Sequence, residues 1–378
     1  MMKNKLLTIF ILILTLFICG CKKKEKANYI IKSYSYYGYL DTVSSVTVQF
    51  DKNKISEETM QQKMKYVETI LLNIETNFST EQTLHMQLAH ISESLLMKVN
   101  SNSGKKDESG NLIYTKVNQE FIDLVKKSID LSNQLEGCFD VTIGPLSALW
   151  DISGQVGELN PIIPTNDEII EKIKLIDYKK ILVDEENQMV ALKDESMQMD
   201  FGAIAKGHAA DKVLEYMKTL DIKVALINLG GNIYSYGESK DQPITVSIRN
   251  PLWSETEENE PYTVVTAEIT NVSAVTSGTY ERYIVVDGKT YHHLLNPKTG
   301  YPFENEILSV TIFGESSTLC DGLATGIYGL GLEKGIEKIK TMEQYKAVFI
   351  TKDKKIYVVG DIKFTLDSGT DGFEIINK

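Results

Sequence analysis

The chain has 378 residues, of which 42% are apolar and 24% charged, which is the composition of a globular protein able to bury a sizeable core. Its net charge is -12 and no basic stripe offsets it, so nucleic acid is excluded as the expected partner. Its four cysteines are too few for a disulfide framework, since two lie in the N-terminal apolar region. The other two, Cys138 and Cys320, could form one bridge or stay as buried thiols.

The first 38 residues predict export and a membrane anchor. Lys3 and Lys5 precede an apolar run at 6–18 that is short for a membrane span and has the length of a signal-peptide core. A small residue and a cysteine follow, as in a bacterial lipobox, so residues 1–20 predict a signal peptide and Cys21 the lipidated first residue. An uncleaved anchor helix is the alternative, and either places the protein at the cell membrane, facing outside the cytoplasm. Segment 21–38, with its lysines, predicts a tether near anionic headgroups.

Apolar spacing predicts the elements of the folded part, which is expected at 39–362, followed by a tail at 363–378. Alternation of Val46, Val48 and Phe50 predicts a strand, and spacings of three and four predict helices. The expected helices are 60–78, 119–135, 167–176, one after Gly207 and one from 317, and the expected further strands are 181–183, 189–192, 197–201, 224–233, 244–249, 263–270, 272–276, 281–286 and 309–313. Because hairpins outnumber strand-helix alternations, the sequence predicts an α+β fold.

Residues 199–211 predict a strand, a glycine-bounded turn and the start of a helix. Such a turn leaves backbone N–H groups unpaired at the positive end of the helix dipole, and with Lys206 beside them it suits a phosphate. Asp200 would add an acceptor or a metal-seeking carboxylate. An ordinary strand-to-helix connection with a solvated lysine is the alternative, because the segment is neither G-x-G-x-x-G nor a Walker loop.

Three further stretches could carry a ligand. Phe139 and Trp150 flank Asp140 and could line a pocket for a flat ring, or equally belong to a tightly turned core segment. The loop at 293–302 carries His293, which can act as a base near neutral pH or be structural. Asp321 and Thr325 lie one helical turn apart, so they could share a Mg²⁺ ion, or be a dipole residue and a packing residue.

Five motifs in this order resemble the FAD:protein FMN transferases, the ApbE family of flavin-inserting lipoproteins: Asp200-Phe-Gly-Ala-Ile-Ala-Lys-Gly207, Asn228-Leu-Gly-Gly231, Thr276-Ser-Gly-Thr-Tyr-Glu-Arg282, His293-Leu-Leu-Asn-Pro-Lys-Thr-Gly300 and Asp321-Gly-Leu-Ala-Thr325. Segments 40–43 and 138–140 match the family's earlier motifs less closely. The resemblance covers roughly residues 36–360 and implies a compact unit related to the T-fold. The missing G-x-G-x-x-G independently argues against a Rossmann domain.

The resemblance implies that FAD is cleaved and that FMN is joined through its phosphate to a threonine or serine of another protein, releasing AMP. It implies that Mg²⁺ is held by the Ala203 carbonyl, Asp321 and Thr325, and that His293 deprotonates the acceptor hydroxyl. It also implies FAD contacts for Leu40, Cys138, Phe139, Asp140, Asp200, Lys206 and Leu295.

The sequence departs from the family pattern at Asn296, Cys138 and Asp41, where the family commonly has Asp, Ala and Gly. None of these three residues is an implied metal ligand, so the departures are expected to tune the implied activity and not to abolish it. Residues 77–100 match poorly, and no FAD contact can be assigned there. The acceptor pattern of the family's substrates, Asp-x-x-Ser/Thr-Gly-Ala-Ser/Thr, is absent, so the expected partner is another chain, an exported electron-transfer protein at the same membrane.

Two alternative functions stay open. The chain could be a Mg²⁺-dependent FAD pyrophosphatase that releases free FMN and AMP, or a lipoprotein that binds flavin without chemistry. Asp321, Thr325, Lys206 and His293 argue against the second, because a binding protein needs neither a metal site nor a base.

Overall fold

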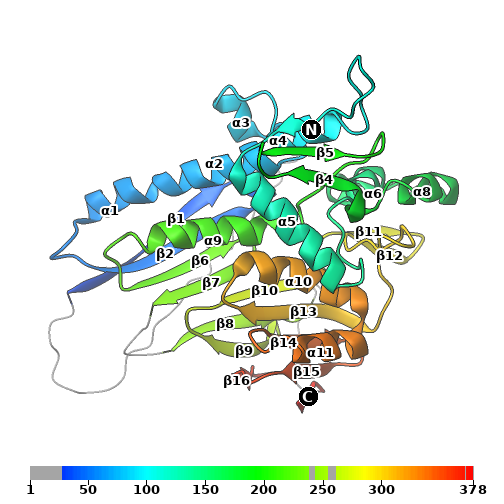
Figure 1. Cartoon of the computed structure of the whole chain (residues 1–378). Coiled ribbons are helices and arrows are strands. Elements are labelled where there is room, and N and C mark those ends of the chain that lie inside the picture. The colour runs from blue at the N-terminus through cyan, green and yellow to red at the C-terminus, as the bar shows by residue number, and fades with distance from the viewer. Residues whose placement is uncertain (1–27, 238–242, 254–260, 371, 378) are drawn as a thin grey trace, which may run out of the picture.

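The computed structural model describes residues 28–237, 243–253, 261–370 and 372–377, and its centre is a nine-stranded sheet (Figure 1). In spatial order the strands are β1 (Tyr29–Tyr37), β2 (Val43–Asp51), β6 (Val224–Leu229), β7 (Asn232–Gly237), β10 (Ser273–Gly278), β13 (Ile307–Gly314), β14 (Lys346–Thr351), β15 (Lys355–Val359) and β17 (Glu374–Asn377). Neighbouring strands are antiparallel except β15 and β17, which are parallel.

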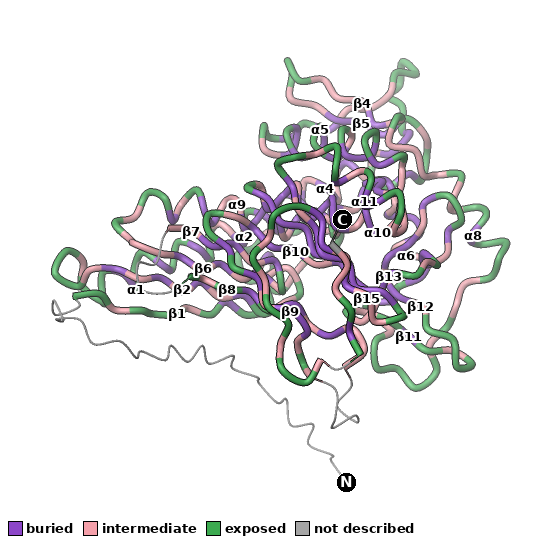
Figure 2. The backbone as a smooth tube through the Cα atoms, turned by 90° about the horizontal axis from the view of Figure 1, so that it is seen from below, coloured by how far each residue is buried: buried purple, intermediate pink, exposed green. Residues whose placement is uncertain are grey.

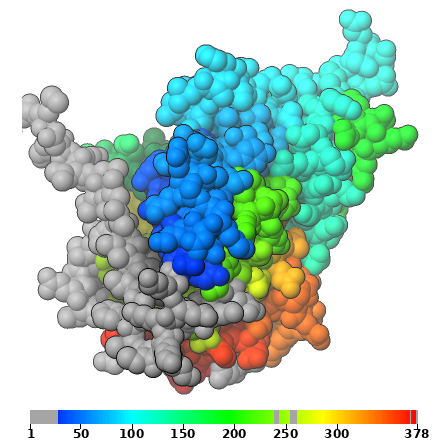
Figure 3. Space-filling model, turned by 90° about the vertical axis from the view of Figure 1, so that its left-hand side faces the viewer, coloured from blue at the N-terminus to red at the C-terminus, as the bar shows by residue number. Residues whose placement is uncertain are grey.

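Several helices lie against one face of this sheet, and the largest apolar cluster fills the space between that face and these helices. The helices are α1 (Glu57–Met64), α2 (Tyr66–Phe78), α3 (Leu84–Leu88), α4 (Leu95–Ser101), α5 (Gln119–Gln134), α6 (Gly144–Trp150), α7 (Ile152–Gln155), α8 (Asn166–Ile173), α9 (Ala205–Met217), α10 (Ser317–Leu330) and α11 (Leu332–Lys340), with short 3-10 turns η1 (Tyr39–Asp41) and η2 (Tyr178–Lys180). Figure 2 shows the buried backbone concentrated in β10, β13 and α10, while β1 is the more exposed edge. Figure 3 shows α1 and α2, in blue, beside α9, in green.

A small sheet packs against the other face. Its order is β16 (Phe364–Leu366), β9 (Thr263–Ile269) and β8 (Ile244–Arg249). Alternation along β14 explains the two layers: Ala347 and Phe349 belong to the cluster under the helices, whereas Val348 and Ile350 belong to the cluster under the small sheet.

A third cluster lies at the edge, where α6, α7 and α8 pack with the hairpin of β11 (Tyr283–Val286) and β12 (Lys289–His292). A further sheet contains β3 (Thr115–Lys116), β5 (Met189–Leu192) and β4 (Ile181–Asp184). The mixture of helices and largely antiparallel sheets confirms the predicted α+β class.

The long helix predicted at 60–78 is helical over that span and is divided into α1 and α2 at Lys65, whose backbone keeps helical angles. The Met64 carbonyl oxygen accepts a hydrogen bond from the Tyr36 hydroxyl, and the Lys63 carbonyl oxygen accepts one from the Tyr216 hydroxyl. These two carbonyls are thus engaged by side chains from distant parts of the chain. Apolar periodicity continues through the division, which is why the sequence predicted one helix.

Two predicted boundaries of the folded part are wrong. Residues 29–37 were expected to be tether, yet they form β1, in which Ile30, Tyr34 and Tyr36 point toward the core while the residues between them are exposed. Residues 363–378 were expected to be tail, yet they contribute β16 and β17 to two sheets. Cys138 and Cys320 are free thiols, so they do not form the disulfide bridge that the sequence left open.

Candidate active site

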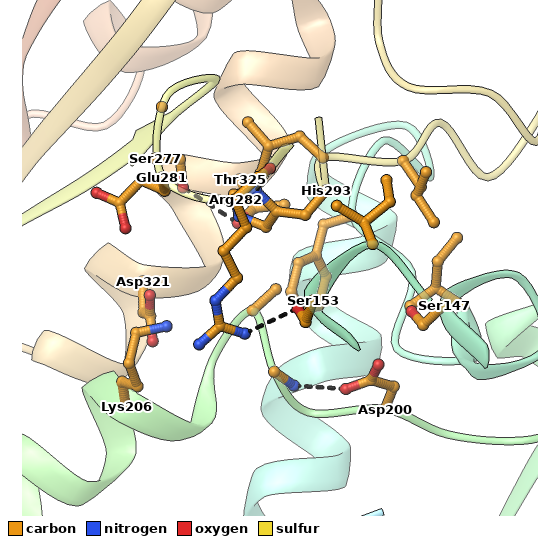
Figure 4. A pocket seen from close by; sticks show the side chains of 18 of the residues that line it. Ser147, Ser153, Asp200, Lys206, Ser277, Glu281, Arg282, His293, Asp321 and Thr325 are labelled. Carbon is orange, nitrogen blue, oxygen red and sulfur yellow. Dashed lines mark hydrogen bonds between the residues drawn. The ribbon is translucent and has the colours of Figure 1, made fainter. Parts of the chain in front are cut away.

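A pocket of about 430 Å³ lies where α9, α10 and the residues flanking the β11–β12 hairpin meet segment 138–153 (Figure 4). Of the site residues predicted within the described ranges, all except Leu40 line it: Cys138, Phe139, Asp140, Asp200, Ala203, Lys206, His293, Leu295, Asp321 and Thr325. Polar lining residues that the sequence analysis did not assign include Asp41, Thr42, Ser153, Ser277, Glu281 and Arg282. The fold therefore brings the separate motifs to one cavity.

The helices that carry Lys206 and Asp321 approach closely at Gly207. A Cβ atom at Gly207 would lie 2.2 Å from the Ser317 carbonyl oxygen and 2.7 Å from Asp321 Cβ, so only glycine fits this contact. The Gly207 amide donates a hydrogen bond of 2.8 Å to Asp321 Oδ2. The start of α9 thus fixes the orientation of the Asp321 carboxylate.

The sequence predicts unpaired backbone N–H groups that could bind a phosphate before and at the start of α9. This prediction is wrong at two positions. The Gly202 amide donates to Asp200 Oδ1 at 2.7 Å, and the Gly207 amide donates to Asp321. The neighbouring Asp200 and the distant Asp321, which the fold brings close, already satisfy these donors. The strand expected at 197–201 is reduced to one bridge, between Gln198 and Ile143. What this segment offers an anion is the Lys206 ammonium group on the pocket wall.

Asp321 and Thr325 face the same cavity from successive turns of α10. Asp321 is only 4% exposed, and its Oδ1 has no hydrogen-bond partner in the described part of the chain. The Thr325 hydroxyl lies 3.3 Å from that of Ser277. No group of three or more His, Cys, Asp and Glu side chains that could hold a metal occurs within the described ranges. One carboxylate oxygen, a hydroxyl and a backbone carbonyl such as that of Ala203 suit Mg²⁺, which keeps water or phosphate oxygens as its other ligands.

His293 is held by the backbone at the start of the hairpin. Its backbone N–H and its ring Nδ1 lie 3.1 and 3.2 Å from the Arg282 carbonyl oxygen. A carbonyl can only accept, so Nδ1 carries the proton and Nε2 keeps its lone pair. Burial, together with the charges of Lys206 and Arg282, lowers the pKa of His293 to about 3. The imidazole is therefore neutral at neutral pH, with Nε2 unprotonated.

The pocket lining is predominantly acidic. Among the described residues that form it, Lys206 and Arg282 are cations, whereas the carboxylates are Asp41, Asp140, Asp151, Asp200, Glu281 and Asp321. Arg282 Nη1 donates to the Ser153 hydroxyl at 3.2 Å, which ties the start of β11 to α7. Burial raises the pKa of Glu281, although Lys206, Arg249 and Arg282 oppose that shift. A cation is thus electrostatically favoured here.

Segment 138–150 belongs to the core and also forms a wall of the pocket. The sequence offered these two roles as alternatives, and the segment has both. The Asp140 carboxylate accepts hydrogen bonds from the Thr142 amide and hydroxyl and from the Tyr178 amide, which shapes the turn. Burial raises the pKa of Asp140. Phe139 and Trp150 are almost fully buried, and the Trp150 indole donates to the Gly300 carbonyl oxygen. Their buried rings stabilise segment 138–150, which carries the Asp140 carboxylate.

Glu281 and Arg282 are the main residues that sequence reasoning missed. Both belong to the motif at 276–282, which was recognised without a role for either residue. Their signal was the position of two opposite charges directly after a buried strand, β10. Only the fold shows that the Arg282 backbone also supports His293.

A sequence profile of the ApbE family matches residues 40–349. The chain belongs to the ApbE family. The FAD:protein FMN transferase of Klebsiella pneumoniae is 32% identical over 285 residues, which cover 75% of this chain and 84% of the relative. The FAD:protein FMN transferase of Treponema pallidum is 31% identical over 254 residues, which cover 64% of this chain and 68% of the relative.

Solved ApbE structures share the fold. An ApbE protein from Thermotoga maritima superposes with a TM-score of 0.71 at 25% identity, covering 88% of this chain and 96% of that chain. The flavin transferase ApbE from Vibrio cholerae gives a TM-score of 0.67 at 22% identity, covering 91% and 99%. The family resemblance inferred from the five motifs is thereby confirmed.

The predicted signal peptide, Cys21 and the first part of the predicted tether lie outside the described residues, which begin at Asn28. From there on, no helix in the described ranges has the length and apolar character that crossing a membrane requires.

Proposed function

We propose that this ApbE-family chain transfers FMN from FAD to a serine or threonine hydroxyl of an exported protein and releases AMP. The observation that carries this proposal is a neutral histidine, His293, with a free Nε2, in one pocket with Lys206, Asp321 and Thr325. Relatives named FAD:protein FMN transferase support the same reaction.

In the proposed reaction the acceptor hydroxyl gives its proton to His293 Nε2 while its oxygen attacks the phosphorus of the FMN half. The bond from that phosphorus to the bridging oxygen breaks, and AMP leaves with that oxygen and the bonding electron pair. One P–O bond forms as another breaks, so no oxidant or reductant is needed. A positioned base of this kind is typically worth about 10²–10⁴-fold in rate.

The charges of the pocket support a Mg²⁺ requirement. Bound by Asp321, Thr325 and the Ala203 carbonyl, Mg²⁺ would neutralise charge on the pyrophosphate oxygens. Lys206 and Arg282 alone are outnumbered by the carboxylates of the lining. An anionic dinucleotide would otherwise be repelled.

Substrate binding would also tune the base. Lys206 and Arg282 contribute to the low pKa of His293, since positive charges disfavour the imidazolium. A bound pyrophosphate would neutralise both cations and raise the pKa of His293. The base would thereby gain proton affinity when FAD is in place.

The proposed location follows from the N-terminal sequence. The apolar run at 6–18 and the small residue before Cys21 support a lipid anchor on the outer side of the cell membrane. The acceptor would then be an exported electron-transfer protein with the pattern Asp-x-x-Ser/Thr-Gly-Ala-Ser/Thr. Metabolic labelling with a palmitate analogue should mark the wild-type chain and not Cys21→Ala. A label that persists in Cys21→Ala contradicts the anchor.

The deciding experiment combines the chain from Lys22 onward with FAD, Mg²⁺ and an acceptor domain that carries this pattern. In-gel flavin fluorescence and the mass of one FMN on the acceptor are the expected result, and His293→Ala should lose them while still binding FAD. His292→Gln is the matched control, because His292 does not belong to the pocket lining. Free FMN and AMP with an unmodified acceptor would indicate a pyrophosphatase, and unchanged FAD would indicate a binding protein.

A further inference from the structure

A buried carboxylate outside the pocket, that of Glu75, joins three elements. Glu75 lies near the end of α2 and is 1% exposed. Its Oε1 accepts a hydrogen bond of 3.0 Å from the Leu40 amide, and its Oε2 accepts one of 2.7 Å from the Thr83 hydroxyl before α3. His85 Nδ1, on α3, lies 3.6 Å from the same Oε2. Figure 1 shows α3 beside α2, and the turn at 38–42 is the third element that Glu75 holds.

The turn at 38–42, which we call the rim turn, has an unfavourable backbone. Gly38, Leu40 and Asp41 have φ angles of 78°, 54° and 53°. The left-handed region is disfavoured for leucine and persists only where surrounding contacts impose it. Besides the Glu75 bond, those contacts are the Gly38 N–H to Thr42 carbonyl bond and the stacking of Tyr39 on His85, with ring centroids 3.6 Å apart and planes 11° apart.

The rim turn reaches the pocket directly. The Leu40 backbone amide donates to Glu75, whereas the side of the turn formed by the next residues, Asp41 and Thr42, lines the cavity. Thr42 also packs on Gly230, where a Cβ atom would lie 2.5 Å from Thr42 Oγ1. The conformation imposed by Glu75 therefore sets one wall of the cavity. The base lies in the loop after β12, and the candidate cation ligands lie on α10 and in the segment before α9, so none of them belongs to the rim turn.

We propose that Glu75 is a positioning residue for FAD binding, acting through the rim turn together with the stacking of His85 on Tyr39. The proposal rests on the proposed transferase function. Because Glu75 holds a wall and not the base, its loss should weaken binding of FAD and leave the chemical step nearly unchanged.

Steady-state kinetics of the intact chain tests this. Glu75→Ala should raise the KM for FAD at least tenfold with kcat within threefold of wild type, and Glu75→Gln should recover most of the KM, since its amide oxygen can still accept from the Leu40 amide. Asp367→Asn is the matched control: Asp367 holds Thr263 and Thr266 but does not belong to the pocket lining, so this variant should keep the wild-type KM.

His85→Ala provides a second variant, which leaves Glu75 and α2 unchanged and should raise the KM severalfold. If Glu75→Ala does not fold, the KM for FAD of His85→Ala tests the proposal instead. A KM within twofold of wild type in His85→Ala, or a loss of kcat at unchanged KM in either variant, would overturn the proposal. FAD affinity, measured by flavin fluorescence, distinguishes a failure of the transferase function from a failure of the proposed role of Glu75. If the wild type binds FAD without transferring FMN, the transferase function is contradicted. The FAD affinities of the Glu75 and His85 variants still test the rim turn in that case.

Discussion

At position 292 the protein buries a histidine whose two ring nitrogens are both used in the neutral form. Nε2 donates to the Phe303 carbonyl oxygen at 3.0 Å, and Nδ1 accepts from the Leu294 amide at 3.3 Å. Burial lowers the pKa of His292 from 6.5 to about 4. The folded state thus resists protonation that the unfolded chain accepts, so stability is complete above about pH 6.5 and falls as the pH drops toward 4, by up to about 3 kcal/mol.

Urea unfolding at pH 7 and pH 4.5 measures this effect. His292→Gln, whose amide can still donate to Phe303, should lose part of the difference in unfolding free energy between the two pH values. His293 adds a contribution of the same sign in both proteins, because burial lowers its pKa as well. An identical difference in wild type and variant would exclude this role for His292.

Asp41 places a negative charge on the pocket wall at a position with φ of 53°. Glycine adopts this left-handed backbone without strain, and aspartate is one of the few other residues that tolerate it. Asp41→Asn keeps the shape and removes the charge, so the KM for FAD should fall about threefold, which is about 0.7 kcal/mol of relieved repulsion. Added salt should shrink the difference between the two proteins. A higher KM in Asp41→Asn would show that the carboxylate assists binding.

At the scale of elements, the contact between α9 and α10 controls the site. Gly207→Ala would force the helices apart, because the added Cβ meets the Ser317 carbonyl oxygen and Asp321. Overpacking of this kind costs about 1–3 kcal/mol. We therefore expect a lower melting temperature and a higher Mg²⁺ concentration for half-maximal transfer. Lys212→Ala, in the same helix but outside the lining, is the control, and an unchanged Mg²⁺ response in Gly207→Ala would contradict this account.

Elements fixed by local periodicity could be predicted, and features fixed by distant contacts could not. The helix at 119–134 ends within one residue of its prediction, because its apolar side packs as the spacing indicates and Asn118 caps it. The division at Lys65 lies beside two carbonyls that accept hydrogen bonds from the hydroxyls of Tyr36 and Tyr216, and no local pattern shows these contacts. β1 was missed because its tyrosines alternate among polar residues.

The same distinction holds for the site. The motif residues were identified from the sequence, and the fold places nearly all of them in one pocket. Leu40 was assigned to that pocket but does not belong to its lining, and its backbone amide donates a hydrogen bond to Glu75. The support of His293 by Arg282 required the hairpin geometry.

At the scale of the whole molecule, charge should make FAD binding depend on a cation. The chain carries a net charge of -12, and the pocket lining has the same sign. EDTA should therefore weaken FAD binding to wild type at least tenfold, as measured by flavin fluorescence. Asp321→Ala should bind FAD with equal affinity with and without Mg²⁺. Tight FAD binding by the wild type in EDTA would show that Lys206 and Arg282 suffice.

The strand order has a consequence for when the enzyme becomes active. β2 pairs with β6, and the cavity needs Asp41 near the start of the fold as well as Thr325 near its end. Contacts this distant in the chain form late and slowly during folding. A nascent or partly translocated chain would therefore lack a complete site. If the chain is exported as proposed, cytoplasmic FAD is protected from it during synthesis, and flavin transfer begins only after folding on the outer side of the membrane.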